Sequence, residues 1–166
     1  MTPRRRLLAA GVAGGLFTGL LTGLVGLTAG LAGCSRDEGW PEGFAPIRWD
    51  RDPCTRCRMI ISDRRFAVEI VGAGANQALK FDDIGCAVFW LRDQASALPW
   101  LGAPTTRLWV ADSASSGAMP RWLDARQAHY TRKTSPMAYN YGAHAEVQTG
   151  AVGFLTLSEQ VLARGH

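Results

Sequence analysis

The chain has 166 residues, with 18 basic and 14 acidic side chains and a formal net charge of +4 at pH 7. Three of the basic residues, Arg4, Arg5 and Arg6, stand at the start of the chain and leave the remainder almost neutral. This balance argues against a nucleic-acid-binding protein, and residues 34–166 suffice for one modest domain with an apolar core.

The first 33 residues have the pattern of an export signal. A basic start is followed by residues 7–33, which carry no charge, and the small residues Ala32 and Gly33 precede Cys34. This order is typical of a lipoprotein signal that is cleaved before a lipidated cysteine. We therefore predict lipidation at Cys34 and a lipoprotein anchored in a membrane of the cell envelope, with its domain facing the periplasm.

An uncleaved transmembrane anchor is the alternative for residues 7–33, because about 20 apolar residues span a bilayer. The glycines in this run have the small-xxx-small spacing that packs membrane helices. Both interpretations place the domain outside the cytoplasm. The initial arginines resemble a twin-arginine signal, so this route and the general secretory route both stay open. Ser35 after the cysteine resembles a signal for sorting to the outer membrane.

Residues 34–50 are rich in glycine, proline and charge and have no steady hydrophobic period, which indicates a flexible tether. Residues 51–166 are then the folded domain. Pro53 suits a turn and disfavours a helix, so we expect the cysteines that follow it to lie on a loop.

A first ββα unit is predicted over residues 64–98. Residues 65–71 are β-rich, 72–76 form a turn signal and 77–81 form the returning strand of a hairpin. A helix is expected from Ile84 to about Ala95, with Asp82 or Asp83 as its N-cap.

A similar order recurs over residues 105–131. We predict a strand at 106–111, a loop at 112–119, a short return strand at 121–123 and a helix from Ala125 to about Tyr130 that Asp124 caps. The sequence therefore predicts an α+β fold in which two small repeated ββα-type units form one compact domain. A C-terminal segment adds a strand near 152–157 and a helix from Glu159, capped by Ser158, to about Arg164.

With Cys34 assigned to lipidation, three cysteines remain. A structural disulfide is the ordinary expectation in an exported domain, and Cys54 and Cys57 could close a small redox loop. Cys86 stands near the start of the first predicted helix. We expect it to be a small buried apolar residue rather than a ligand.

Cys57 and Met59 have the spacing Cys-x-Met. On an extended segment, residues two apart point the same way, so the two sulfur atoms would converge. A thiolate with a thioether is a donor set that selects Cu(I), and Arg56 and Arg58 favour the thiolate form of Cys57. A third soft donor is available from Met137, which follows Pro136 on a second turn.

These motifs resemble the NosL family, the copper-binding accessory lipoproteins of nitrous oxide reductase. The resemblance covers nearly all of the chain after the signal. It is carried by Cys34 with the small residues before it and by the following segments: Cys54-Thr55-Arg56-Cys57-Arg58-Met59-Ile60-Ile61, Phe81-Asp82-Asp83-Ile84-Gly85-Cys86, Trp122-Leu123-Asp124-Ala125 and Ser135-Pro136-Met137.

The resemblance implies two similar ββα-type units related to the core of organomercurial lyase. It further implies a non-enzymatic metallochaperone that binds Cu(I) through Cys57, Met59 and Met137, with Cys54 as a further candidate ligand. The implied partners are nitrous oxide reductase, whose copper-sulfide centre would receive the metal, and its membrane maturation machinery. The family has Cys-Gly-Met where this chain has arginine in the middle position. The family also has a glycine-rich run after the methionine. This chain instead has residues 138–144, which end in His144, an alternative ligand.

Other functions compete with copper delivery. An exported thiol–disulfide oxidoreductase would use Cys54 and Cys57, although such pairs usually open a helix and this pair precedes a β-rich run. A zinc site would require more thiolates or histidines, because methionine is a poor zinc donor. Organomercurial cleavage would require a cysteine pair with an acid, for example Cys57 and Cys86 with Asp83. The identity of the cuproprotein client stays open.

Overall fold

The structure, a computed structural model, describes residues 39–72 and 78–165 and has the mixed α+β architecture that the sequence predicts. Four antiparallel strands form a sheet in the order β2-β1-β3-β4, and two further strands, β5 and β6, form a separate antiparallel pair. The elements are β1 (Val68–Val71), β2 (Ala78–Phe81), α1 (Ile84–Gln94), the 3-10 helix η1 (Pro99–Gly102), β3 (Arg107–Ala111), β4 (Trp122–Asp124), β5 (His129–Arg132), β6 (Tyr141–His144) and α2 (Phe154–Arg164).

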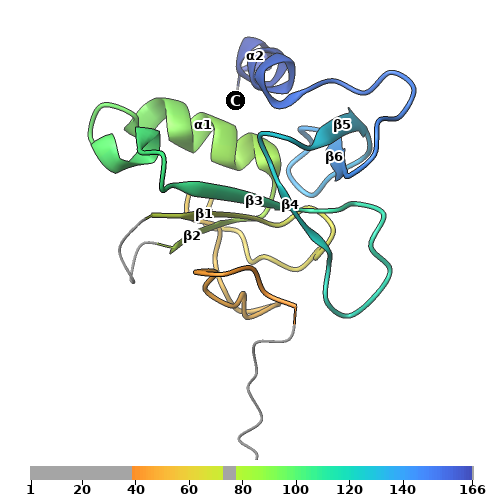
Figure 1. Ribbon diagram of the computed structural model, residues 1–166, viewed down its shortest axis with the longest axis horizontal. Helices are drawn as coiled ribbons and strands as arrows, with labels where there is room; N and C mark the ends of the chain where they lie inside the picture. Colours follow the sequence, from red (N-terminus) through yellow and green to blue (C-terminus); the bar gives the residue numbers. More distant parts are fainter. Residues whose placement is uncertain (1–38, 73–77, 166) are drawn as a thin grey trace, which may run out of the picture. The chain divides into compact units, whose positions relative to one another are not determined.

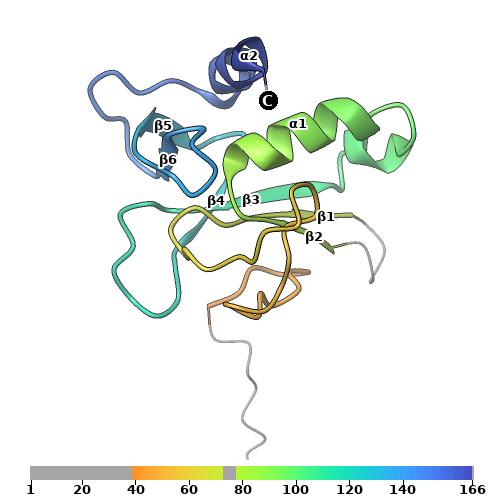
Figure 2. The ribbon, with the colours of Figure 1, turned by 180° about the vertical axis from the view of Figure 1, so that it is seen from behind.

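Helix α1 covers one face of the four-stranded sheet, and α2 lies beside α1 (Figures 1 and 2). Alternation along β1 directs Val68 and Ile70 toward this helix, together with their cross-strand neighbours Val110 and Leu108. Phe81 of β2 packs there against Trp90 of the helix. The main core of the domain therefore lies between the sheet and α1.

The opposite face of the sheet is covered by residues 39–50, drawn in orange in Figure 1. Phe44 and Ile47 are buried, and the rings of Trp40 and Phe44 lie against Trp122 of β4. These residues belong to the segment that the sequence assigns to a flexible tether, yet they are packed onto the domain. The reason is their aromatic content, because burying such rings stabilises a fixed position of the chain. The remaining tether residues, 34–38, lie outside the described residues.

Glu69 lies at the centre of this second interface and is fully buried. One carboxylate oxygen accepts a hydrogen bond from the backbone N–H of Ala45 at 2.7 Å, while the other has no hydrogen-bond partner among the described residues. Burial raises the pKa of Glu69 from 4.5 to about 8, against a smaller lowering effect of the Ala45 hydrogen bond and of Lys80. The folded protein therefore favours the protonated form of this carboxyl at neutral pH.

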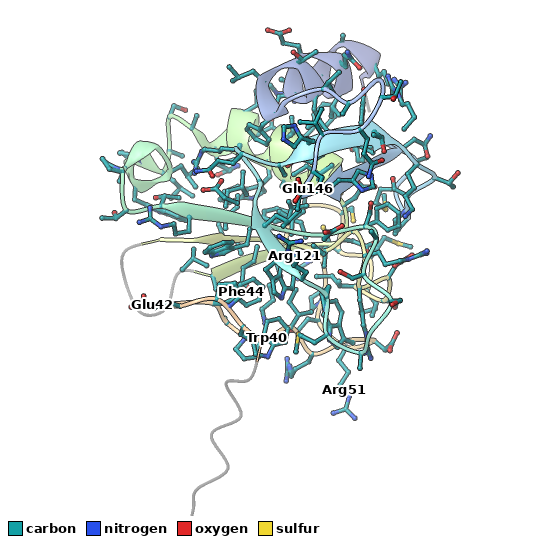
Figure 3. All side chains as sticks on the ribbon, turned by 45° about the vertical axis from the view of Figure 1, so that its right-hand side comes forward. Trp40, Glu42, Phe44, Arg51, Arg121 and Glu146 are labelled. Atoms are coloured by element: carbon teal, nitrogen blue, oxygen red, sulfur yellow. The ribbon has the colours of Figure 1, made fainter. Side chains whose placement is uncertain are left out.

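We expect Glu69→Gln to make the folded protein more stable at pH 8 and to flatten its pH dependence. The pKa is higher in the folded than in the unfolded state, so the stability linked to this group is complete below pH 4.5 and is lost as pH rises through 8. Denaturant titrations from pH 5 to pH 8.5 measure this effect. Exposed Glu146, labelled in Figure 3, provides the control variant Glu146→Gln, which should leave the profile unchanged. Parallel profiles of the wild type and Glu69→Gln would contradict the prediction.

The first predicted ββα unit is confirmed. β1 and β2 pair as an antiparallel hairpin, and α1 follows with Asp83, rather than Asp82, as its N-cap, since the Asp83 carboxylate accepts a hydrogen bond from the N–H of Gly85. Part of the predicted turn, residues 73–76, lies outside the described residues.

The second unit is not a ββα repeat. β3 and β4 pair as predicted, but the helix expected over 125–130 is wrong: residues 125–127 form a turn and His129 begins β5. β5 is held by pairing with distant strand β6 and by two backbone hydrogen bonds between Tyr130 and Val152. These contacts with other segments outweigh the local preference for a helix after Asp124, which the sequence indicates as a possible N-cap.

The C-terminal prediction is also corrected. Val152 forms only an isolated bridge, and α2 begins at Phe154, within the segment 152–157 that the sequence assigns to a strand. The N-cap is Gly153, while Ser158 lies inside the helix and donates to the carbonyl of Phe154. The predicted end at Arg164 is confirmed.

The predicted signal segment, residues 1–33, and the lipidation site Cys34 lie outside the described residues. Among the residues that the structure describes, none of the helices combines the length and apolar character needed to cross a membrane.

Candidate metal centre

Three cysteines from two parts of the chain meet at one point. The Sγ atoms of Cys54, Cys57 and Cys86 all lie within 4.8 Å of one another. Cys54 and Cys86 are fully buried, and Cys57 is partly exposed. The thioether of Met137 extends the cluster, because its Sδ atom lies 3.9 Å from the Sγ atom of Cys57. The structure therefore assembles three thiols and one thioether with one side open to solvent.

The loop that carries Cys54 and Cys57 is closed by its own backbone. The N–H of Cys54 donates to the carbonyl of Met59 at 2.7 Å, and the N–H of Arg58 donates back to the carbonyl of Cys54 at 3.1 Å. A further hydrogen bond, from Thr55 N–H to the carbonyl of Lys80, fixes the loop to β2. We designate residues 54–59 the cysteine loop.

Asp52 holds the start of the cysteine loop in place. Its carboxylate accepts hydrogen bonds from the backbone and side chain of Arg48 and from the ammonium group of Lys80. Although burial acts to raise it, these contacts hold the pKa of Asp52 at about 2. The loop is thus anchored to β2 at neutral pH by a charged network of which Asp52 is the centre.

Cys86 is presented by the first turn of α1, immediately after the β2 strand to which the cysteine loop is bonded. The positive end of a helix dipole favours negative charge at this position. The sequence analysis treats Cys86 as a buried apolar residue. The structure confirms its burial but also places its sulfur within the cluster.

The Asp83 carboxylate joins α1 to the turn that carries Met137. One carboxylate oxygen caps the helix at Gly85, and the other accepts hydrogen bonds from the Ser135 hydroxyl and from the Met137 N–H, the latter at 3.3 Å. Asp83 is fully buried, and burial raises its pKa against these lowering contacts. This single side chain therefore sets the position of Met137 relative to the helix that bears Cys86.

The three thiols differ in their protonation. The Cys86 thiol donates a hydrogen bond to Cys54, and backbone N–H groups of Cys57, Asp82 and Arg56 also act on Cys54, so that its pKa falls to about 5 in spite of burial. The same hydrogen bond and burial raise the pKa of Cys86. Burial chiefly raises the pKa of Cys57. Cys54 is therefore the most acidic of the three thiols.

Asp82 adds an acidic group beside the cluster. It is buried, and desolvation together with the negative charge of Cys54 raises its pKa to about 6. One of its carboxylate oxygens has no hydrogen-bond partner in the described part of the chain. A buried thiolate next to a carboxyl group makes this a place where a bound cation would offset unfavourable negative charge.

Met59 does not occupy the position that the Cys-x-Met argument requires. The argument assumes an extended segment, but Arg58 has φ of 66°, so the chain turns between Cys57 and Met59. Met59 is 57% exposed. Strand alternation therefore does not apply to Cys57 and Met59, and Met59 as a ligand stays a prediction. The sulfur atoms that the structure places close together are those of Cys54, Cys57, Cys86 and Met137.

We expect Arg58→Gly to stabilise the folded protein by about 0.5 to 1 kcal/mol. A left-handed conformation costs an L-residue about 1 to 2 kcal/mol, which glycine avoids, while the greater freedom of glycine in the unfolded chain removes part of the gain. Thermal and denaturant unfolding measure the difference. The control Arg51→Gly lies on the neighbouring turn, where the backbone is not left-handed, and should be destabilising. A less stable Arg58→Gly variant would refute the backbone argument.

His144, the alternative ligand from the sequence, is placed on β6 and is not part of the cysteine cluster. Its Nε2 atom lies 2.8 Å from the hydroxyl of Thr131 and 3.4 Å from that of Ser113. Burial lowers the pKa of His144, so it is a neutral, packed histidine at pH 7. An open surface hollow lined by residues 62–65 and 115–117 contains none of the sulfur residues.

In comparisons with known proteins, the chain matches no protein-family model and no curated protein. Membership of the NosL family therefore remains a prediction from the motifs. The function has to be argued from the cluster itself.

Proposed function

We propose that this protein binds one Cu(I) ion at the cysteine cluster and delivers it to an exported cuproprotein. The observation that carries the proposal is the meeting of the Cys54, Cys57 and Cys86 sulfur atoms within 4.8 Å of one another, with the Met137 thioether 3.9 Å from Cys57. Soft thiolate and thioether donors of this kind select Cu(I) over hard cations.

The spacing of the sulfur atoms is compatible with a three-coordinate ion. For a metal–sulfur bond of about 2.3 Å, three sulfur atoms in a trigonal arrangement stand about 4 Å from one another. Small rotations of the cysteine side chains would bring the cluster to this spacing. Met137 stands at the edge as a further, weaker donor. We propose this ligand set in preference to the predicted set of Cys57, Met59 and Met137 with Cys54 as a further candidate.

The exposure of the ligands suits a protein that hands its metal on. Cys54 and Cys86 are buried and would hold the ion on its protein-facing side. Cys57 and Met137 are partly exposed and therefore accessible to an incoming ligand. A receiving protein could add its own donor before the first thiolate leaves. No turnover of a substrate is required, so the protein acts as a metallochaperone rather than an enzyme.

The place of delivery comes from the sequence. The export signal with Cys34 supports a lipid-anchored protein in the cell envelope, and the motif resemblance to the NosL family supports nitrous oxide reductase as the client. A cuproprotein of the same compartment is the broader expectation. Radiolabelled lipid incorporation, lost in Cys34→Ser, tests the anchor independently of copper.

Competition titrations under anaerobic conditions test the metal. We expect one Cu(I) per chain, bound far more tightly than Zn²⁺, because the fourth position offers a thioether rather than the thiolate or imidazole that zinc prefers. Zinc that displaces Cu(I) from the reduced protein at equal concentration would overturn the assignment. The absence of any stoichiometric Cu(I) binding would overturn the proposed function as a whole.

A thiol–disulfide oxidoreductase is the competing function, and the lowered pKa of the Cys54 thiol supports it. Against it, the Cys54–Cys57 pair lies on a turn rather than at a helix N-terminus, the arrangement usual for such enzymes. Catalytic reduction of insulin by the wild type, abolished in Cys54→Ser, would establish the oxidoreductase instead of the chaperone.

A further inference from the structure

Four arginine side chains are linked to the cysteine loop by sequence or through the shared neighbours Phe89 and Tyr139. Arg56 and Arg58 flank Cys57 on the cysteine loop, Arg92 extends from α1 and Arg164 from the end of α2. Three of the four are exposed, and Arg56 is partly exposed. We designate these four residues the arginine rim.

Aromatic rings hold the arginine rim together. The guanidinium groups of Arg56 and Arg92 lie 4.6 Å and 4.7 Å from the centroid of the same ring, that of Phe89. Arg56 also donates a hydrogen bond to the hydroxyl of Tyr139 at 3.0 Å, and Arg164 donates to the Tyr139 carbonyl at 3.3 Å. Cation–π contacts and these hydrogen bonds fix the positions of the charges in advance of any partner.

Two contacts connect the rim to the partly exposed ligands Cys57 and Met137. Arg56 precedes Cys57 in the sequence, and the Tyr139 that Arg56 and Arg164 contact lies two residues after Met137. Asp93 pairs with Arg92 at 2.7 Å and offsets part of the positive charge of the rim. Met59 and Ile60, 57% and 47% exposed, add an apolar patch beside Arg58.

We propose that the arginine rim, with exposed Met59 and Ile60, docks a protein partner whose own copper-binding site is bordered by acidic side chains. The inference rests on the proposed Cu(I) function, because it identifies the partner by its approach to the metal. Charge complementarity of this kind chiefly raises the rate of encounter and orients the partner, and salt weakens it. An acidic protein surface fits better than a membrane, because the rim presents charge and the metal has to reach a protein ligand.

The test uses the full-length protein in neutral detergent and three synthetic Cu(I)-acceptor peptides. Each peptide has the same two-cysteine core, flanked by glutamates, by glutamines or by lysines. Stopped-flow transfer from the copper-loaded protein should be at least about 10-fold faster to the glutamate than to the lysine peptide at low salt, and the difference should vanish in about 0.5 M salt. Equal rates for all three peptides at low salt would overturn the proposal.

The variant Arg58→Gln/Arg92→Gln removes charge from the rim and leaves Arg56 and Arg164, which contact Tyr139, in place. It should lose most of the preference for the glutamate peptide while it still binds one Cu(I) per chain. The control Arg51→Gln/Arg121→Gln removes two exposed arginines from the other part of the domain, beside residues 40–50 (Figure 3), and should keep the preference. Equal loss in both variants would show a general charge effect and refute a specific rim.

A second arm separates this proposal from the copper function. Binding of the glutamate peptide, with its cysteines replaced by serine, to the metal-free reduced protein should shift the NMR signals of the cysteine loop and α1. If the protein fails to bind Cu(I), the chaperone function is contradicted. The NMR titration alone then tests whether the arginine rim binds an acidic partner. Shifts elsewhere on the surface, or rim-dependent binding to vesicles of anionic lipid in place of the peptide, would overturn the acidic protein partner.

Discussion

Replacing Cys86 with serine is expected to weaken Cu(I) binding by at least about 100-fold, whereas Met59→Leu should change the affinity by less than about 3-fold. The structure places the Cys86 sulfur within 4.8 Å of those of Cys54 and Cys57, while Met59 lies beyond the turn at Arg58 and is 57% exposed. Changes of residues that merely contact a metal ligand already cost about 10- to 100-fold, so loss of a ligand should cost at least as much.

Competition against a Cu(I) chelator measures both affinities. The matched control is Ala87→Ser, which introduces a hydroxyl at the neighbouring buried position of α1 and leaves every sulfur atom in place. It separates loss of a ligand from the general effect of a polar atom in the helix. The reverse order, a large effect of Met59→Leu and a small effect of Cys86→Ser, would restore the ligand set predicted from the sequence.

Gly85→Ala is expected to destabilise the folded protein by about 3 kcal/mol. A Cβ atom built on Gly85 would lie only 2.1 Å from Cγ and 2.2 Å from Cδ2 of the Tyr139 ring, which is itself buried. The ring would have to move, and with it the contacts of Tyr139 with Phe89 and Arg56. Overpacking of a well-filled site typically costs about 1 to 3 kcal/mol, and helix propensity alone would have favoured alanine by up to about 1 kcal/mol.

Denaturant unfolding of the metal-free protein measures this effect, and Gly102→Ala is its control. A Cβ atom on Gly102 would meet nothing within 4 Å, so this variant should remain within about 0.5 kcal/mol of the wild type. Because Tyr139 follows Met137 by two residues, the shifted ring should also displace the thioether from Cys57. A Gly85→Ala protein as stable as the wild type would show that the close packing of α1 against Tyr139 is not as described.

The parts of the fold that the sequence predicts well are those that local pattern determines. The hairpin of β1 and β2 follows from two β-rich runs around a turn signal, and α1 follows from an Asp83 cap before an apolar face. The missed strand β5 lacks such a signal. Its partners are residues 141–144 and Val152, and no rule of local propensity links Tyr130 to either.

In the candidate site, too, the residues found from the sequence are those with a local motif, and the one missed is brought in by the fold. The cysteine loop and the Met137 turn were identified from the chemistry of their residues, and the structure places the Cys57 and Met137 sulfur atoms 3.9 Å apart. The sequence analysis takes Cys86 as a small buried apolar residue, the usual role of an isolated cysteine near the start of a helix. No local pattern places Cys86 beside Cys54, because they meet only through the hydrogen bond that joins the cysteine loop to β2, the strand before α1. The strand alternation that suggests Met59 does not hold in a segment that turns at Arg58, so Met59 as a ligand stays a prediction.

X-ray absorption of the Cu(I)-loaded protein tests the central claim most directly, because it reports the number and type of the atoms bound to copper. We predict an all-sulfur site with three copper–sulfur bonds of about 2.3 Å in the wild type and one fewer thiolate in Cys86→Ser. Nitrogen or oxygen donors in the wild-type spectrum, or a spectrum that Cys86→Ser leaves unchanged, would contradict copper binding by Cys54, Cys57 and Cys86.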